Sequence, residues 1–159
     1  MNKEYVIKFG DHVRNRRFNE IRTRDMCMNL EECYQLLGGD YADVCRRLPS
    51  KKLIEKFIGK FLEDKSFETL CAMFQDGNRK EAFLAAHTLK GICANLGFQS
   101  LLYSSGQLTE LLRPETDTIP EAAQPWMEQV KKDYEKTAVT IRLYFSGGGS
   151  ENCSARGEG

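Results

Sequence analysis

The chain has 159 residues, of which 41% are hydrophobic and 29% charged, and its formal net charge at pH 7 is zero. This length and composition are typical of one globular domain with a single hydrophobic core. A chain without net charge has no general attraction for DNA, RNA or an anionic membrane, so we expect none of these as a partner. No apolar run reaches the roughly 18 residues that a membrane-spanning helix needs, and the N-terminus lacks the hydrophobic segment of a signal peptide.

The two ends of the chain show no sustained periodicity. Residues 1–25 carry seven lysine and arginine residues against four acidic residues, and we expect a basic, loosely ordered extension there. Residues 147–159 begin with a run of glycine and serine and are expected to form a flexible tail. The folded domain is therefore expected to span residues 26–146.

The six cysteines contain no C-x-x-C pair, and most of them lie in stretches with helical periodicity. Reduced thiols of a cytoplasmic protein suit this distribution better than a disulfide framework. A zinc site is not expected, because the second histidine of the chain, His12, has no cysteine cluster beside it. We expect no metal and no cofactor of the chain's own.

The spacing of hydrophobic residues predicts an all-α domain. Asn78 with Glu81 resembles a capping box, and Thr118 with Glu121 is expected to cap the last helix. The longer helices have short antiparallel connections, which predicts an up-and-down four-helix bundle with short extra helices at its N-terminal side. In chain order, the predicted helices span residues 28–37, 41–48, 50–64, 66–75, 78–96 and 98–113, and a last helix follows the loop 114–120.

The helix that ends at Leu96 carries a histidine on the face opposite its hydrophobic stripe. An ideal helix turns ~100° per residue, so the residues of the stripe fall within roughly 60° of Leu89. His87 falls about 160° from Leu89, and Gly91 lies one turn along on the same side. The imidazole is therefore expected to point away from the core, toward a partner. The stripe consists of Ala82, Ala86, Leu89, Cys93 and Leu96, and the residues that flank His87 are Phe83, Leu84 and Ala94.

The residues around this histidine suit phosphoryl transfer. An imidazole with the usual pKa of about 6.5 is largely neutral at pH 7, and its lone pair can attack an activated phosphoryl group without a separate base. Lys90 lies one turn away and can reach a phosphoryl oxygen, whereas Gly91 leaves room beside the ring. The glycine costs the helix about 1 kcal/mol relative to alanine, which indicates a functional reason for it. The sequence has no glycine-rich phosphate loop and no acidic cluster for Mg²⁺ near His87, so a kinase is not expected.

At these residues the sequence resembles the histidine-containing phosphotransfer (HPt) family, whose members are intermediates of multistep bacterial phosphorelays. The resemblance covers about residues 48–112 and a closing helix. It implies that His87 is the phosphorylated residue, that Lys90 stabilises the phosphoryl group, and that Gly91 provides access. The family pattern is His-x-x-Lys-Gly followed after four residues by Leu-Gly, and it is matched by His87, Lys90, Gly91, Leu96 and Gly97.

The resemblance also implies a partner and the surface that binds it. The partner is the receiver domain of a response regulator or of a hybrid histidine kinase, whose aspartate and Mg²⁺ do the transfer chemistry. The chain would be a monomeric cytoplasmic phosphohistidine carrier that passes the group from one receiver to another. The implied docking surface consists of Phe83, Leu84, Ala94 and Phe98.

The chain departs from the family pattern at two positions. Ile92 stands where many members have serine or alanine. Thr109 stands where many members have a glutamine that faces the imidazole, and a threonine reaches less far toward the ring. Neither change removes the acceptor.

Two other functions fit the same helix. A passive interaction module would bind a partner on the exposed apolar face without a covalent step. An enzyme with a helical-bundle fold would use His87 as a general base, and this predicts a pocket with a second polar group near the ring. Phe83 and Leu84 can also pack under the N-terminal helices, which would remove them from the docking surface.

Overall fold

The computed structural model describes residues 28–147, and every regular element within them is an α-helix. The all-α prediction is thus confirmed for this part of the chain. The predicted extension 1–25 and the tail from residue 148 onward lie outside the described residues. The helices are α3 (Leu30–Leu37), α4 (Tyr41–Arg47), α5 (Lys51–Glu63), α6 (Ser66–Gln75), α7 (Arg79–Leu96), α8 (Gln99–Leu112) and α9 (Ala123–Ser146).

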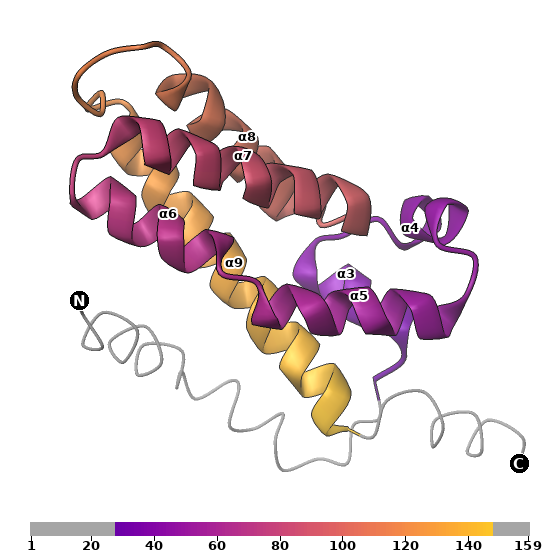
Figure 1. The fold of residues 1–159 in the computed structure, drawn as a ribbon. Coiled ribbons are helices and arrows are strands. Elements are labelled where there is room, and N and C mark those ends of the chain that lie inside the picture. Colours follow the sequence, from indigo (N-terminus) through magenta and orange to yellow (C-terminus); the bar gives the residue numbers. More distant parts are fainter. Residues whose placement is uncertain (1–27, 148–159) are drawn as a thin grey trace, which may run out of the picture.

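Helix α7 occupies the middle of the molecule, where it packs against α6 and α8 (Figure 1). Helix α8 packs in turn against the long helix α9, and only two residues separate α5 from α6. The short helices α3 and α4 lie at the end of the molecule where α7 is followed by α8 (Figure 1). Over its central turns, one side of α7 carries exposed residues and is covered by none of the helices within residues 28–147, and we call it the open side.

Side-chain caps begin several of these helices, and the cap at α7 is the one that the sequence predicted. At α3, Asn29 and Glu32 form a reciprocal capping box. At α5, the Ser50 hydroxyl accepts a hydrogen bond from the backbone N–H of Leu53 at 3.2 Å. At α7, the Asn78 side chain does the same for the N–H of Glu81 at 3.2 Å. Each bond satisfies one of the N–H groups that a helix leaves unpaired at its start.

Helix α9 begins differently from the prediction. Its first residue is Ala123, and Ala122 precedes it with no side-chain cap, so the predicted cap by Thr118 and Glu121 is wrong. Pro125 is the third residue of α9. Proline fits the first turn because the N–H that it lacks has no partner within the helix at that position.

Aromatic rings join helices that are far apart in the sequence. The Phe98 ring, between α7 and α8, meets the Phe61 ring of α5 with centroids 5.1 Å apart and the Tyr34 ring of α3 at 5.8 Å. The Phe67 ring of α6 stacks on the Tyr134 ring of α9 with centroids 3.7 Å apart. Such rings bury large areas and prefer these tilted or offset geometries, so they hold the helices in place around α7.

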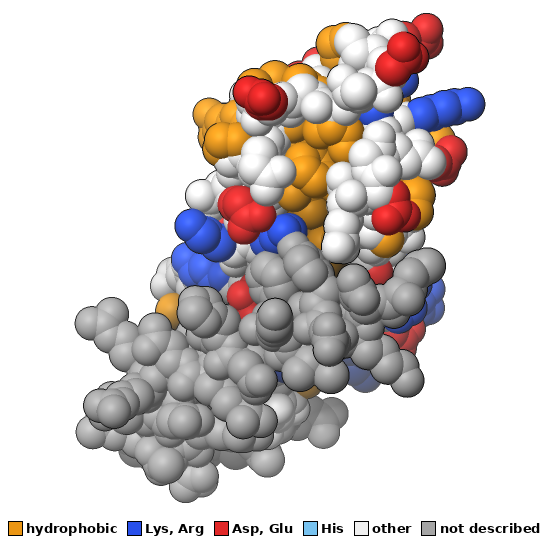
Figure 2. Space-filling model, turned by 90° about the vertical axis from the view of Figure 1, so that its left-hand side faces the viewer, with side chains coloured by type: hydrophobic (Ala, Val, Ile, Leu, Met, Phe, Trp, Pro, Cys, Tyr) orange, Lys and Arg blue, Asp and Glu red, His pale blue; other side chains and the backbone are white. Residues whose placement is uncertain are grey.

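The core reaches the surface at one end of the molecule. The view onto the end where α6 turns into α7 shows a strip of hydrophobic side chains between polar and charged ones (Figure 2). Several hydrophobic residues are only partly buried while they pack on the core, among them Phe74, Ile119 and Trp126. Among residues 28–147, no helix combines the length and the low polarity that crossing a membrane requires.

The four cysteines of the described residues are free. Three of them are buried or half-buried, and the fourth is exposed. Burial raises the pKa of the Cys33 and Cys71 thiols to about 12, and it raises the pKa of Cys93 further. Cys45 is exposed on α4. Alkylating reagents attack the thiolate, so a thiol with a raised pKa and no access reacts slowly.

We therefore expect iodoacetamide at pH 8 to modify Cys45 of the folded protein well before these three buried or half-buried thiols. Peptide mass spectrometry after a short exposure measures the order of modification. Denatured protein provides the control, since all four thiols should then react at similar rates. Early modification of Cys33 or Cys93 in the native protein would contradict this packing.

Candidate functional site

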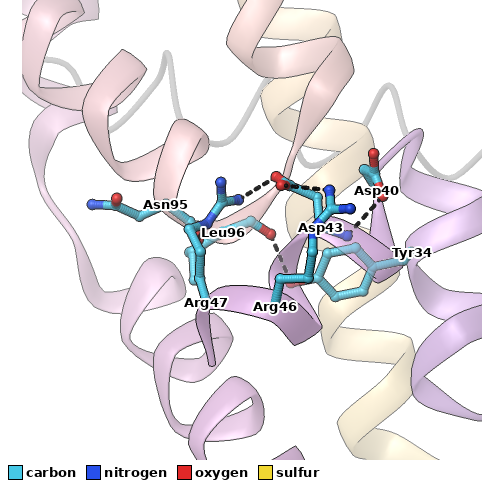
Figure 3. Close-up of polar contacts among 7 residues, drawn as sticks. All are labelled: Tyr34, Asp40, Asp43, Arg46, Arg47, Asn95 and Leu96. Atoms are coloured by element: carbon cyan, nitrogen blue, oxygen red, sulfur yellow. Dashed lines mark hydrogen bonds and ion pairs between the residues drawn. The ribbon is translucent and has the colours of Figure 1, made fainter. Parts of the chain in front are cut away.

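The C-terminal end of α7 is fixed by side chains from α3 and α4 (Figure 3). The Tyr34 hydroxyl donates a hydrogen bond to the carbonyl of Leu96 at 2.8 Å, and Arg47 Nε donates to the carbonyl of Asn95 at 3.3 Å. Arg47 is itself held by Asp43, with Nη2 and Oδ2 2.5 Å apart. The last carbonyls of a helix have no partner within it, so these two donors satisfy groups that would otherwise be unpaired.

Gly97 ends α7 with a φ of 70°, in the left-handed region where glycine is favoured. Its carbonyl accepts a hydrogen bond from the backbone N–H of Asp40 at 2.8 Å. A Cβ at this position would lie 2.8 Å from the Asp40 carbonyl oxygen, closer than side chains tolerate. Gly97 is thus required both by its backbone angle and by its contact with the start of α4.

The N-terminal end of α7 is tied to the end of α8. The Arg79 guanidinium donates a hydrogen bond to the carbonyl of Leu112 at 2.6 Å and another to the carbonyl of Thr116 at 2.7 Å. Together with the Asn78 cap, this fixes the first turn of α7. His87 is the middle residue of a helix whose two ends are both anchored, so the backbone that carries it is well supported.

His87 is exposed, as the sequence predicts, and it lies on the open side of α7. The predicted hydrophobic stripe is buried at every position. Thr88 and Gly91 are also exposed on the open side, and a Cβ added to Gly91 would meet no atom within 4 Å. Helix α7 therefore presents the imidazole beside bare backbone.

The predicted docking residues divide into two groups. Leu84 is 47% exposed and Ala94 is exposed, so both can contact a partner. Phe83 is half-buried, and its ring lies parallel to the His87 ring within 23°, with centroids 5.9 Å apart. Phe98 is completely buried, and its prediction as a docking residue is wrong. Its ring packs between Tyr34 and Phe61, which leaves it no surface to offer a partner.

Lys90 lies beside a carboxylate from the neighbouring helix. Its Nζ is 3.8 Å from Glu110 Oε1, and its side chain is 35% exposed. Glu110 is held more tightly by Arg113, whose Nη2 and Nε donate hydrogen bonds to the two carboxylate oxygens at 2.8 and 3.0 Å. The Arg113 guanidinium carbon lies 5.6 Å from the centre of the Phe83 ring, close enough for a cation–π contact.

These contacts add two charged side chains, Glu110 and Arg113, to the residues that the sequence pattern indicates around His87. We name His87, Phe83, Lys90, Glu110 and Arg113 the acceptor cluster. The hydrogen bonds from Arg113 hold the pKa of the Glu110 carboxyl below its usual value, and the positive charges of Arg113 and Lys90 act in the same direction. Glu110 is therefore ionised at neutral pH, as a carboxylate between two cations.

Thr109 does not face the imidazole. It is completely buried, and its hydroxyl donates a hydrogen bond to the Ser105 carbonyl at 2.6 Å within α8. The next residue, Glu110, approaches α7 instead. A signal for this was present in the sequence, since Thr109 lies three residues before the core residue Leu112 and so on the same face of the helix.

A pocket of about 490 Å³ lies beside the C-terminal half of α7, between α7 and the helices α4 and α5. Ile92, which stands where many HPt proteins have a smaller residue, lines this pocket together with Phe57 and Lys60. The pocket is thus lined by residues from three helices, including Asn95, whose carbonyl accepts the hydrogen bond from Arg47.

The cluster contains a nucleophile and cations but no set of metal ligands. Among residues 28–147, no group of three or more histidine, cysteine or acidic side chains could hold a metal ion. An exposed imidazole can form a covalent bond to an electrophilic phosphorus atom, and lysine and arginine can stabilise the charge of the phosphoryl group. This arrangement can accept a phosphoryl group that a partner has already activated.

Comparison with known proteins agrees with this chemistry. The family model described as Hpt domain matches residues 30–139. The matched region contains the acceptor cluster and all of the helices from α3 to α8. Comparison with curated proteins and with solved structures gives no match.

Proposed function

The chain belongs to the Hpt domain family, and from this premise we propose that His87 accepts a phosphoryl group from a receiver-domain aspartate and passes it to another receiver. Hpt domains carry phosphoryl groups on histidine in phosphorelays, interact with receiver domains and are not kinases. The observation that carries the proposal is the exposed imidazole at the middle of α7, with Lys90 one turn away and open space at Gly91.

The proposed step needs only the groups of the acceptor cluster and those of a receiver. The neutral imidazole uses the lone pair of one ring nitrogen to form the N–P bond, while the P–O bond to the receiver aspartate breaks and its electron pair stays on the carboxylate. The imidazolium formed in this way then loses the proton of its other nitrogen to solvent. We propose that the Mg²⁺ that assists the transfer is held by the receiver, since the chain needs to supply only the nucleophile and stabilising cations.

The proposed docking surface surrounds His87 on α7. Leu84 lies one turn before His87 and Ala94 two turns after it, and both are exposed. A receiver that covers them would place its active site over the imidazole and the bare backbone of Gly91.

In this proposal, α6 to α9 form the up-and-down four-helix bundle, and α3 and α4 are additions to it. The chain works as a cytoplasmic monomer.

A transfer assay tests the proposal directly. The chain is mixed with a receiver domain that carries radioactive phosphate on its aspartate, and the label on each protein is followed with time. We expect label to move to the chain and to be acid-labile and alkali-stable, as a phosphohistidine is. A stable complex in which the chain remains unlabelled would instead support the passive interaction module.

Gly91 provides a prediction that separates stability from transfer. Gly91→Ala should stabilise the fold by up to about 1 kcal/mol, because alanine favours the helix and the added Cβ meets open space. The same Cβ should slow phosphoryl transfer by about tenfold, since it stands where the phosphoryl group and the receiver must approach. Thermal unfolding and the transfer assay measure the two effects.

Gly59→Ala is the matched control for this substitution. Gly59 is also in the middle of a helix, and its added Cβ would make only an ordinary contact with the Phe145 ring at 3.8 Å. We expect a similar gain in stability and no change in transfer. Transfer at the original rate by Gly91→Ala would show that clearance at this position is not needed.

A further inference from the structure

We propose that Glu110 is a positioning residue that binds Lys90 and Arg113 in the unphosphorylated protein and competes with the phosphoryl group for them, so that it favours onward transfer from His87. The inference rests on the proposed function and adds a regulator of the equilibrium to it. Glu110 does not touch the reacting atoms in this account, since it acts through the two cations.

The geometry distinguishes the two cations that Glu110 binds. Arg113 is held by two hydrogen bonds of 2.8 and 3.0 Å, which is the paired arrangement that fixes a guanidinium most firmly. Lys90 Nζ is 3.8 Å from the carboxylate, too far for a hydrogen bond, and its side chain is partly exposed. Lys90 is therefore the cation that can turn toward a phosphoryl group on His87, one helical turn away.

The surroundings of Lys90 leave it room to turn. Its side chain lies next to Gly106 of α8, where an added Cβ would be 3.9 Å from Lys90 Cε and would meet no other neighbouring atom within 4 Å. Arg113 is more restricted, because it is bonded to Glu110 and lies over the Phe83 ring. A phosphoryl group on His87 would thus compete with Glu110 mainly for Lys90.

The charges of the cluster give the direction of the effect. Lys90 and Arg113 bring two positive charges, and Glu110 cancels one of them. A phosphoryl group adds roughly two negative charges, so it arrives at a cluster that is only half as positive as its cations alone would make it. Both the repulsion from Glu110 and the loss of its contact with Lys90 raise the energy of the phosphorylated form. A carrier with this property gives its phosphoryl group away more readily.

Replacing Glu110 with glutamine tests the inference, because glutamine keeps the shape and removes the charge. The measurement is the equilibrium ratio of label on the chain to label on the receiver, at low salt and at about 1 M salt. We expect Glu110→Gln to raise this ratio about threefold at low salt, and less at high salt because the ions screen the charges. A merely structural loss would lower the ratio or leave it unchanged, and it would lower the unfolding temperature.

Two further variants control the result. Glu68→Gln removes the same charge from an exposed pair on α6, where Glu68 lies 3.2 Å from Lys65, and it should leave the ratio unchanged. In a Lys90→Gln background, the effect of Glu110→Gln should shrink, because the cation through which Glu110 acts is missing.

Each outcome has a separate meaning for the two proposals. If the original chain takes no label at all, the proposed function fails. If the original chain is labelled but Glu110→Gln gives the same ratio, or a lower one, the role of Glu110 is overturned and the carrier function stands. An unreduced effect of Glu110→Gln in the Lys90→Gln background also overturns the inference, since Lys90 would then have no part in it.

Discussion

Replacing His87 with glutamine is expected to abolish acid-labile label on the chain in the transfer assay. Glutamine has a polar side chain of moderate size, but its amide offers no lone pair that can form a stable bond to phosphorus. His87 is exposed, so the substitution should change the free energy of unfolding by no more than about 0.5 kcal/mol. The measurements are the label on the chain and a denaturant titration of the same variant.

The sequence provides a matched control for this loss. The chain has two histidines, and His12→Gln changes the one that lies outside the described residues. We expect His12→Gln to take up label like the original chain. Label that persists in His87→Gln and disappears in His12→Gln would show that His12 is the acceptor and would contradict our proposal.

Replacing Phe98 with alanine is expected to lower the free energy of unfolding by about 3 to 5 kcal/mol. The ring is completely buried between the Phe61 and Tyr34 rings, so its removal leaves a cavity where three helices meet. Any loss of receiver binding should follow from unfolding alone, and it should vanish under conditions where the variant is fully folded. Chemical denaturation and a binding titration at low temperature measure the two effects separately.

Leu84→Ala is the counterpart of this variant on the surface of α7. Leu84 is 47% exposed, so its truncation should change stability by only about 0.5 kcal/mol. A side chain that becomes buried under a receiver contributes to binding, and we expect the dissociation constant to rise by about fivefold or more. A Leu84→Ala variant that binds the receiver as tightly as the original chain would exclude Leu84 from the docking surface.

Helix α7 could be predicted well because its caps and its hydrophobic stripe agree: it begins after Asn78 and ends before Gly97 as expected. Helix α6 has the predicted bounds although it has no side-chain cap. The Asn78 cap and the left-handed Gly97 are local features of the sequence, so they mark both ends of α7 although distant residues also hold these ends. Helix α9 begins with no side-chain cap, so its start could not be read from a capping pattern. The exposure of His87 followed from helical geometry alone.

The errors at the site concern the way one helix turns relative to another. Phe98 stands between α7 and α8, where the Gly97 backbone redirects the chain, and no periodicity shows which way such a residue points. Thr109 stands where many family members have a glutamine that faces the imidazole, but in this chain its side chain is buried and bonded within α8. The contact between Lys90 and Glu110 depends on the packing of α7 on α8, which the sequence of either helix does not contain.

Gly97 shows that the family pattern combines two kinds of constraint. His87, Lys90 and Gly91 are placed for chemistry, whereas Gly97 joins the end of α7 to the start of α4 through a backbone bond and a contact that excludes any side chain. A relative that kept the first three residues and replaced this glycine would retain its reactive groups but lose the joint that orients them. The final glycine of the signature is thus required by the fold. A sequence search that includes this glycine selects proteins that share the helical scaffold as well as the reactive residues.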